Sequence, residues 1–493
     1  MATTFGVYVG NSSACVACYK DGKADIIADA NGDRSMSTAV IFTEGEQVVG
    51  NAAKQSRNFK NKVLHAKKAF GLSEADLSKV DDEFGAKLTY FNEPTFKVFL
   101  NDKEKRFTPA QVLSVVFKKL RETAQSYSGL DSAPEAVICT PYNFSKHERD
   151  LMSDAAKNGG FKVLRLINEP SAALLAYDLG QDNSHESQSC LVIRHGGQTT
   201  TFTLIRIRGG VYSIIDELDE NFGSDLVTQL LADHMQRDFE KRFRANIGDS
   251  IKPRAKLRNE AEQVKHTLST LQSATCSVDS LWDGMDFQSS LTRSRLEGLC
   301  SDYVGKFVTL LKDFLQKNKI NNIDSVVLSG GGCRMPLLRN KLQSMFENSQ
   351  ILSSINVEEA TALGAAKQSA IVICSKKPEL KEEDTIVTCT NYNLYVKDKT
   401  GEKIRIVEQL TPLPIRRQFQ CNIDDASSAV FSFVSEEDGI EKDLGDMVIK
   451  DMEDTCSKLT MVVHVEMDST INIHLSSADG SFAENFSFDP RDN

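Results

Sequence analysis

The sequence of 493 residues predicts a mixed α/β domain over residues 1–375 and a small all-β domain over residues 389–493. In the first part, short apolar runs alternate with helix-like segments, which is typical of sheets covered by helices on both faces. Near Ser375 the composition changes to a charged segment, and residues 376–388 are predicted to be a linker. Beyond it, apolar and polar residues alternate with a period of two, the pattern of half-buried strands.

The first half of the α/β part contains two hairpin-like segments with the same layout. Residues 5–9 and 14–19 are apolar and are joined by the tight turn of residues 10–13. A second hairpin begins at residues 190–193 and turns around residues 196–198. Because the two segments are alike, a duplicated half-domain is predicted. The other predicted elements are strands at 39–42, 136–139, 163–166 and 326–328, and helices at 148–158, at 171–177, over most of 224–320 and from Pro336 onward.

Composition and charge limit the classes of function. The chain carries 58 Lys and Arg against 69 Asp and Glu, a net charge of −11, so direct nucleic-acid binding is not expected. No apolar run approaches the ~18 residues of a membrane helix, and the first lysine is Lys20, without the basic start of a secretory signal. Eleven cysteines lack a framework spacing, and Cys15 and Cys18 face opposite sides of a predicted strand, which indicates free structural thiols. A cytosolic protein without membrane contact is predicted.

Three glycine-containing turns follow apolar strands, at residues 10–13, 196–199 and 330–334. Such turns can point successive backbone N–H groups at one spot, which suits a phosphate group. A single turn of this kind is usually only a tight turn, but three in one α/β chain, together with Lys67 and Lys265, favour a phosphorylated ligand. None matches the Walker sequence or the dinucleotide fingerprint.

Four separated motifs give the sequence a family resemblance. They lie at residues 167–177 (beginning Ile-Asn-Glu-Pro-Ser), 262–269, 278–287 and 330–336 (Gly-Gly-Gly-Cys-Arg-Met-Pro). In these motifs, their order and their spacing, the chain resembles the seventy-kilodalton heat-shock chaperones, and within them a short-tailed branch that includes a subunit of the ribosome-associated complex. The resemblance implies a two-lobed actin-like ATPase fold with nucleotide between the lobes, followed by a truncated β substrate-binding domain without a helical lid.

The resemblance carries roles to individual positions. Lys67 matches the lysine at the γ-phosphate and Glu169 the glutamate near the metal-bound water, so these two are the expected catalytic residues of a degenerate site. The full set expected to bind ATP or ADP is Gly10, Asn11, Ser12, Ser13, Lys67, Gly197, Gln198, Thr199, Glu262, Lys265, His266, Ser269, Gly331, Arg334 and Glu358.

Three departures from the family pattern, Tyr8, Arg194 and Thr201, fall where the family carries metal-orienting aspartates. Such carboxylates orient the waters of Mg²⁺, and phosphoryl transfer depends on that metal to neutralise developing charge. The departures therefore predict that Mg²⁺ is at best weakly held, that no side chain ligates a metal, and that ATP is bound but hydrolysed weakly or not at all. Arg194 either bonds phosphate oxygens directly or turns outward into a surface ion pair.

Three functions were compared with this pattern. The first is a weakly or non-hydrolysing co-chaperone that pairs with a J-domain protein, reaches the ribosome through that partner, and assists nascent or unfolded polypeptides. The second is an autonomous ATP-hydrolysing chaperone, which Lys67 and Glu169 favour and the departures oppose. The third, a sugar or acetate kinase on the same fold, is disfavoured by the β-rich tail. We expect the first.

Overall fold

The computed structural model divides into two compact units, residues 1–378 and residues 379–493. The predicted linker, residues 376–388, lies outside the described residues. The described ranges are 3–56, 61–77, 84–129, 131–181, 187–208, 210–248, 250–320, 322–374, 389–397, 403–409, 411–422, 428–437, 440–450, 458–466, 469–477 and 483–488.

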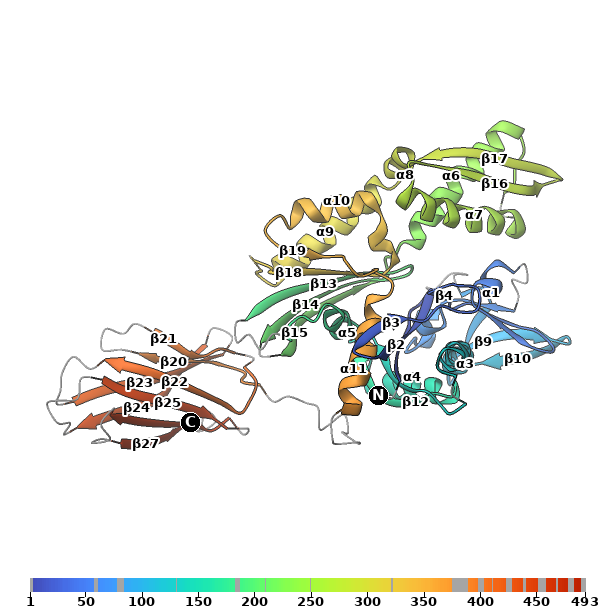
Figure 1. Ribbon diagram of the computed structural model, residues 1–493. Helices are drawn as coiled ribbons and strands as arrows, with labels where there is room; N and C mark the ends of the chain where they lie inside the picture. Colours follow the sequence, from blue (N-terminus) through green and yellow to red (C-terminus); the bar gives the residue numbers. More distant parts are fainter. Residues whose placement is uncertain are drawn as a thin grey trace. The chain divides into compact units, whose positions relative to one another are not determined.

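Two sheets of the first unit have the same strand order, each at the centre of one lobe (Figure 1). In each, three antiparallel strands are followed by two parallel ones, which confirms the predicted duplication. The first sheet runs β3 (Lys23–Ile26), β2 (Ser13–Lys20), β1 (Thr4–Val9), β11 (Glu135–Thr140), β12 (Lys162–Asn168). The second runs β15 (Val211–Glu220), β14 (Thr200–Arg208), β13 (Gln188–His195), β18 (Ser325–Ser329), β19 (Gln350–Leu352).

Two helices are exchanged between the lobes. Helix α5 (Glu169–Ala176) follows strand β12 of the first sheet, yet its Leu174 packs on the second sheet beside Val192. Helix α11 (Ala360–Cys374) follows the second sheet, yet Ala362 packs on the first. The two helices touch at Gly364, where a β-carbon would overlap the carbonyl oxygen of Ala172. Helix α11 therefore covers the sheet of the other lobe, and α5 contacts both sheets, since its Ala172 also packs with Val137 of the first sheet.

The remaining helices fall into two groups, one in each lobe. Capping boxes at Thr108 and Ser145 begin the two helices of the first lobe. These are α3 (Pro109–Ser128) and α4 (Lys146–Asn158), and the second lobe has α6 (Asp225–Phe243), α7 (Ile251–Thr270), α8 (Arg293–Leu299), α9 (Ser301–Lys317) and α10 (Pro336–Met345). Smaller elements of the first lobe are β4 (Met36–Ser37), β5 (Val40–Phe42), β6 (Gln47–Val49), α1 (Asn51–Gln55), β7 (Lys62–Val63), α2 (Glu74–Leu77), β8 (Lys87–Phe91), β9 (Glu93–Leu100) and β10 (Lys103–Phe107).

The expectation that helices dominate residues 224–320 was wrong over residues 273–292. This segment forms a hairpin of β16 (Ser273–Trp282) and β17 (Met285–Thr292). Its first strand has alternating burial, with Ala274, Cys276 and Val278 buried between exposed neighbours. The period of two was present in the sequence, but the long flanking helices masked it.

The second unit is a β-sandwich, as predicted from the period-two pattern. One sheet contains β20 (Asn393–Lys397), β21 (Lys403–Val407), β23 (Ser428–Glu437) and β24 (Ile440–Lys450). The other contains β22 (Ile415–Asn422), β25 (Lys458–Val465), β26 (Ile471–Ser477) and β27 (Ala483–Phe488). Leu394, Phe433, Met461 and Ile473 are buried between the sheets. All regular elements of this unit within the described residues are strands.

Cys15 and Cys18 are free thiols in different buried clusters, as their spacing predicted. Among the helices that the structure describes, none combines the length and the apolar character that crossing a membrane requires.

Candidate functional site

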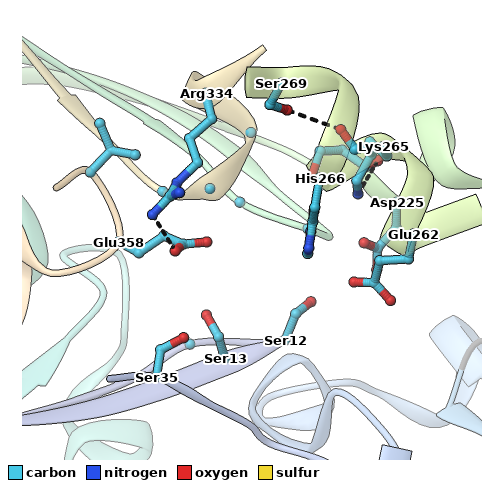
Figure 2. Close-up of a pocket in the computed structure, with 18 of the residues that line it drawn as sticks. Ser12, Ser13, Ser35, Asp225, Glu262, Lys265, His266, Ser269, Arg334 and Glu358 are labelled. Carbon is cyan, nitrogen blue, oxygen red and sulfur yellow. Dashed lines mark hydrogen bonds and ion pairs between the residues drawn. The ribbon is translucent and has the colours of Figure 1, made fainter. Parts of the chain in front are cut away.

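A cleft of about 920 Å³ lies in the first unit between elements of its two lobes. All three glycine turns contribute to its lining, as does helix α7. Figure 2 shows Ser12 and Ser13 on one side of this space, and Glu262, His266 and Arg334 on others. Every residue predicted to bind nucleotide lines this cleft except Lys67. Predictions taken from five separate segments therefore fall on one cavity.

The two phosphate-type turns have matching backbone geometry. In the first turn the Gly10 amide donates to the Ser13 carbonyl oxygen at 2.8 Å, and in the second the Gly196 amide donates to the Thr199 carbonyl oxygen at 2.9 Å. The equivalence expected from the duplicated half-domain therefore extends to the turns themselves.

Behind the turns lies a buried group of charges centred on Glu169. Lys67 Nζ is 2.7 Å from Glu169 Oε1, and Arg194 Nε is 3.0 Å from Glu169 Oε2. The Arg194 pair is not aligned as a hydrogen bond, so Oε2 has no donor of its own. The exposed fractions of the three side chains are 3%, 1% and 12% for Lys67, Glu169 and Arg194. The predicted catalytic pair is thus in direct contact, and a second cation shares its carboxylate.

These contacts shift the proton affinity of each member. Burial lowers the pKa of Lys67, and the charge of Glu169 only partly offsets this effect. Burial also opposes ionisation of Glu169, but Arg194 and Lys67 hold the pKa of its carboxyl below the usual value. For Arg194 the attraction of Glu169 outweighs burial and raises the pKa of the guanidinium. These directions favour an ionised Glu169 and a protonated Arg194, whereas burial disfavours the charged form of Lys67.

Arg194 pairs with the buried Glu169 and also lines the cleft, so its direct contact with phosphate oxygens stays a prediction. Its side chain is only 12% exposed, so the expected outward-facing surface ion pair was wrong. Its Nη2 donates to Thr201 Oγ1 at 3.1 Å, and Thr201 in turn donates to Asp219 Oδ1 at 3.1 Å. Tyr8 lies against the same group, with Lys67 Nζ 5.6 Å from the centre of its ring, and burial raises the pKa of its phenol. The three departures thus form one contact network.

The other end of the cleft carries charges that stay in contact with solvent. Glu262 pairs with Lys54 of the opposite lobe at 2.6 Å, and Arg334 pairs with Glu358 at 2.9 Å. Lys265 Nζ donates to Thr228 Oγ1 at 2.8 Å, and Ser269 Oγ donates to the Lys265 carbonyl oxygen at 3.0 Å. Burial and the nearby Lys265 lower the pKa of His266, so its imidazole favours the neutral form.

The sequence reading missed four polar residues of this region. Lys54 and Asp225 line the cleft, His65 lies between the two turns, and Glu217 stands behind Arg194. Burial raises the pKa of Glu217 to about 7. His65 stands two residues before Lys67 in a segment already singled out, whereas no motif marked Lys54, Asp225 or Glu217.

The repeated sheets, the exchanged helices and the cleft between the lobes define a two-lobed protein of the actin-like ATPase class. A family model described as "Hsp70 protein" matches residues 4–468. The chain is 35% identical over 471 residues to "Heat shock 70 kDa protein 14" of Danio rerio, covering 92% of this chain and 93% of that protein. The Homo sapiens protein of that name is 35% identical over 446 residues (88% and 87%), and the Xenopus tropicalis protein is 32% identical over 497 residues (97% and 98%).

The chain belongs to the Hsp70 family of chaperones. Membership implies binding of ATP or ADP, and interaction with unfolded polypeptides and co-chaperones in general.

Proposed function

We propose that this chain is a cytosolic co-chaperone subunit that binds ATP or ADP in the cleft but hydrolyses ATP weakly or not at all. It pairs with a J-domain protein, reaches the ribosome through that partner, and assists nascent or unfolded polypeptides on residues 389–493. Residues 1–375 bind the nucleotide and residues 376–388 connect the two parts. Direct contact with nucleic acid or membrane is not part of this function.

The observation that carries the proposal is the pairing of Glu169 with both Lys67 and Arg194. A hydrated Mg²⁺ needs carboxylates that are free to orient its waters. Here the carboxylate behind the turns is neutralised by two cations, and a guanidinium stands where the family carries an aspartate. The donor set therefore does not suit Mg²⁺.

The positive charge of Arg194 gives nucleotide phosphates a partner without a metal. Charge-assisted hydrogen bonds contribute about 1.5–3 kcal/mol each, and a guanidinium can bond two phosphate oxygens at once. Nucleotide binding should therefore depend little on Mg²⁺, whereas hydrolysis, which relies on the metal to neutralise developing charge, should be lost.

Calorimetric titration with ATP, in Mg²⁺ and in excess chelator, tests the binding part. We expect Kd to change less than about 100-fold on chelation and the Arg194→Ala variant to lose about tenfold in affinity, the effect of one charge-assisted bond. Arg237→Ala, at an exposed position of α6, is the matched control. Unchanged ATP binding by Arg194→Ala would remove this arginine from the site. Single-turnover hydrolysis at the rate of an ordinary Hsp70 would refute the non-hydrolysing part.

The partner is tested by affinity purification from cytosol with ribosomes retained. We expect a J-domain protein at equal stoichiometry, and loss of ribosomes when that protein is depleted. Ribosome binding by the isolated chain would contradict the indirect route.

An autonomous ATP-hydrolysing chaperone remains the second candidate, because the 2.7 Å contact between Lys67 and Glu169 keeps the expected catalytic pair together. It predicts slow, nucleotide-controlled release of a fluorescent peptide. The co-chaperone predicts fast release, because a β domain without lid helices cannot latch a peptide and affinity differences appear mostly in the off-rate.

A further inference from the structure

One buried histidine contacts both phosphate-type turns. His65 lies at the start of the short helical turn Ala66–Ala69 and has a left-handed backbone, with φ 54°. Its Nδ1 is 3.0 Å from the Asn11 carbonyl oxygen in the first turn. Its Nε2 is 3.2 Å from the amide nitrogen of Gln198 in the second turn. The imidazole therefore bridges two turns that belong to different lobes.

The hydrogen-bond partners determine the form of the imidazole. A carbonyl oxygen can only accept, so Nδ1 of His65 must carry a proton. The Gln198 amide nitrogen can only donate, so Nε2 of His65 must accept. The same Gln198 nitrogen also donates to Asp225 Oδ2 at 2.5 Å. A neutral imidazole with its proton on Nδ1 satisfies the contacts to Asn11 and Gln198, and Gln198 in turn bonds to Asp225.

Asp225 accepts the other hydrogen bond of the Gln198 amide nitrogen. Burial opposes its ionisation, but Lys265 keeps the pKa of its carboxyl below the usual range, so it stays an acceptor. The turns also meet directly, because a β-carbon on Gly197 would collide with Ser12 Oγ. The two turns are thus held at contact distance by side chains of both lobes.

We propose that His65 is a positioning residue that joins the two phosphate turns through Gln198 and thereby limits how fast nucleotide exchanges. This inference rests on the proposed nucleotide site, because a terminal phosphate enters between these turns. Opening the His65–Gln198 contact separates the turns and lets the phosphates leave.

Hydrogen exchange of the full-length protein without nucleotide tests whether the His65–Gln198 contact holds the two turns together. His65→Asn keeps a donor at the Nδ1 position, and asparagine is one of the residues that tolerate a left-handed backbone, but it has no group at the Nε2 position. We expect exchange to become about three- to tenfold faster in both turns, the effect of one buried hydrogen bond. Gln198→Ala should do the same. The double variant should be no faster than either single variant, because both remove one contact. His65→Gln, whose amide reaches the Nε2 position, should restore much of the protection.

Faster exchange confined to the first turn, or additive effects in the double variant, would overturn the proposal, since a merely structural histidine would behave in that way. Release of a fluorescent ADP should also be about three- to tenfold faster in His65→Asn, by the same hydrogen-bond argument. Unchanged release would overturn the role in nucleotide exchange. Failure of the wild-type protein to bind ADP would instead refute the proposed function. The hydrogen-exchange result for the protein without nucleotide would still decide whether His65 and Gln198 hold the two turns together.

Discussion

The two ends of the cleft use charge in opposite ways. At the phosphate end, Lys67, Glu169 and Arg194 are buried and paired with one another. At the other end, Arg334 and Glu358 also form an ion pair, but their side chains are 46% and 30% exposed. A buried charge that loses its partner is left without water, whereas an exposed one is solvated again. Removing a charge at the phosphate end should therefore cost stability, whereas removing one at the other end should cost little.

The sharpest test of this difference is the loss of one carboxylate from each end. Glu169→Ala removes the carboxylate shared by Lys67 and Arg194, and we expect a loss of about 3–5 kcal/mol in the free energy of unfolding. Urea unfolding can be followed through Trp282, the single tryptophan of the chain, which lies in the first unit. Glu358→Ala is the matched control and should cost less than about 1 kcal/mol.

A second substitution guards against a variant that simply fails to fold. Adding Arg194→Met to Glu169→Ala removes one unpaired cation and should recover part of the lost stability. Equal losses for Glu169→Ala and Glu358→Ala would show that burial does not distinguish the two ends.

A smaller effect is expected from the carboxyl group behind Arg194. Burial raises the pKa of Glu217 from 4.5 to about 7, so the folded state holds this proton more tightly than the unfolded state. The stability from this group is complete below pH 4.5 and is lost as pH rises through 7. Glu217→Gln, which keeps an acceptor for Thr203, should match wild type near pH 5 and exceed its stability by on the order of 2 kcal/mol at pH 8.

Asp216, one residue earlier on β15, is the control for this pH dependence. It is paired with Lys317 at 2.8 Å, and that hydrogen bond lowers the pKa of its carboxyl. Asp216→Asn should therefore leave the pH profile above neutrality unchanged. A Glu217→Gln variant whose stability difference from wild type is the same at pH 5 and pH 8 would contradict the assignment.

The smallest effect is expected at the exposed end. Arg334→Ala removes a surface ion pair and should change the free energy of unfolding by less than about 1 kcal/mol. Its effect should appear in nucleotide affinity, with a loss of a few-fold in Kd measured by calorimetry. A fall in stability as large as that of Glu169→Ala would mean that the exposed end also supports the fold.

Strand and turn patterns predicted the fold well, because each lobe repeats one arrangement. The hairpins at residues 5–19 and from residue 190 onward carried both the period of two and the glycine turns, and they became the centres of the two sheets. The hairpin at residues 273–292 was missed because its alternation lies between long helices. What decided its structure was burial against the second lobe, which a local pattern does not contain.

The candidate site was predicted less completely, because motifs specify positions and not side-chain partners. Arg194 was identified as a departure, but its pairing with Glu169 depends on a helix and a strand brought together by the fold. His65 and Asp225 joined the site through contacts between residues more than a hundred positions apart. Such contacts follow from the packing of the two lobes, which only the three-dimensional arrangement supplies.

The contact between α5 and α11 has a mechanical consequence. Because only a hydrogen atom of Gly364 faces the Ala172 carbonyl oxygen, the two backbones meet without a layer of side chains that could be compressed. Each helix covers the sheet of the other half, so the width of this contact fixes the spacing of the two halves. A methyl group at residue 364 would push them apart, and every contact across the cleft, from Lys54–Glu262 to His65–Gln198, would have to lengthen with it. A residue without a side chain thus sets the spacing on which the width of the cleft depends.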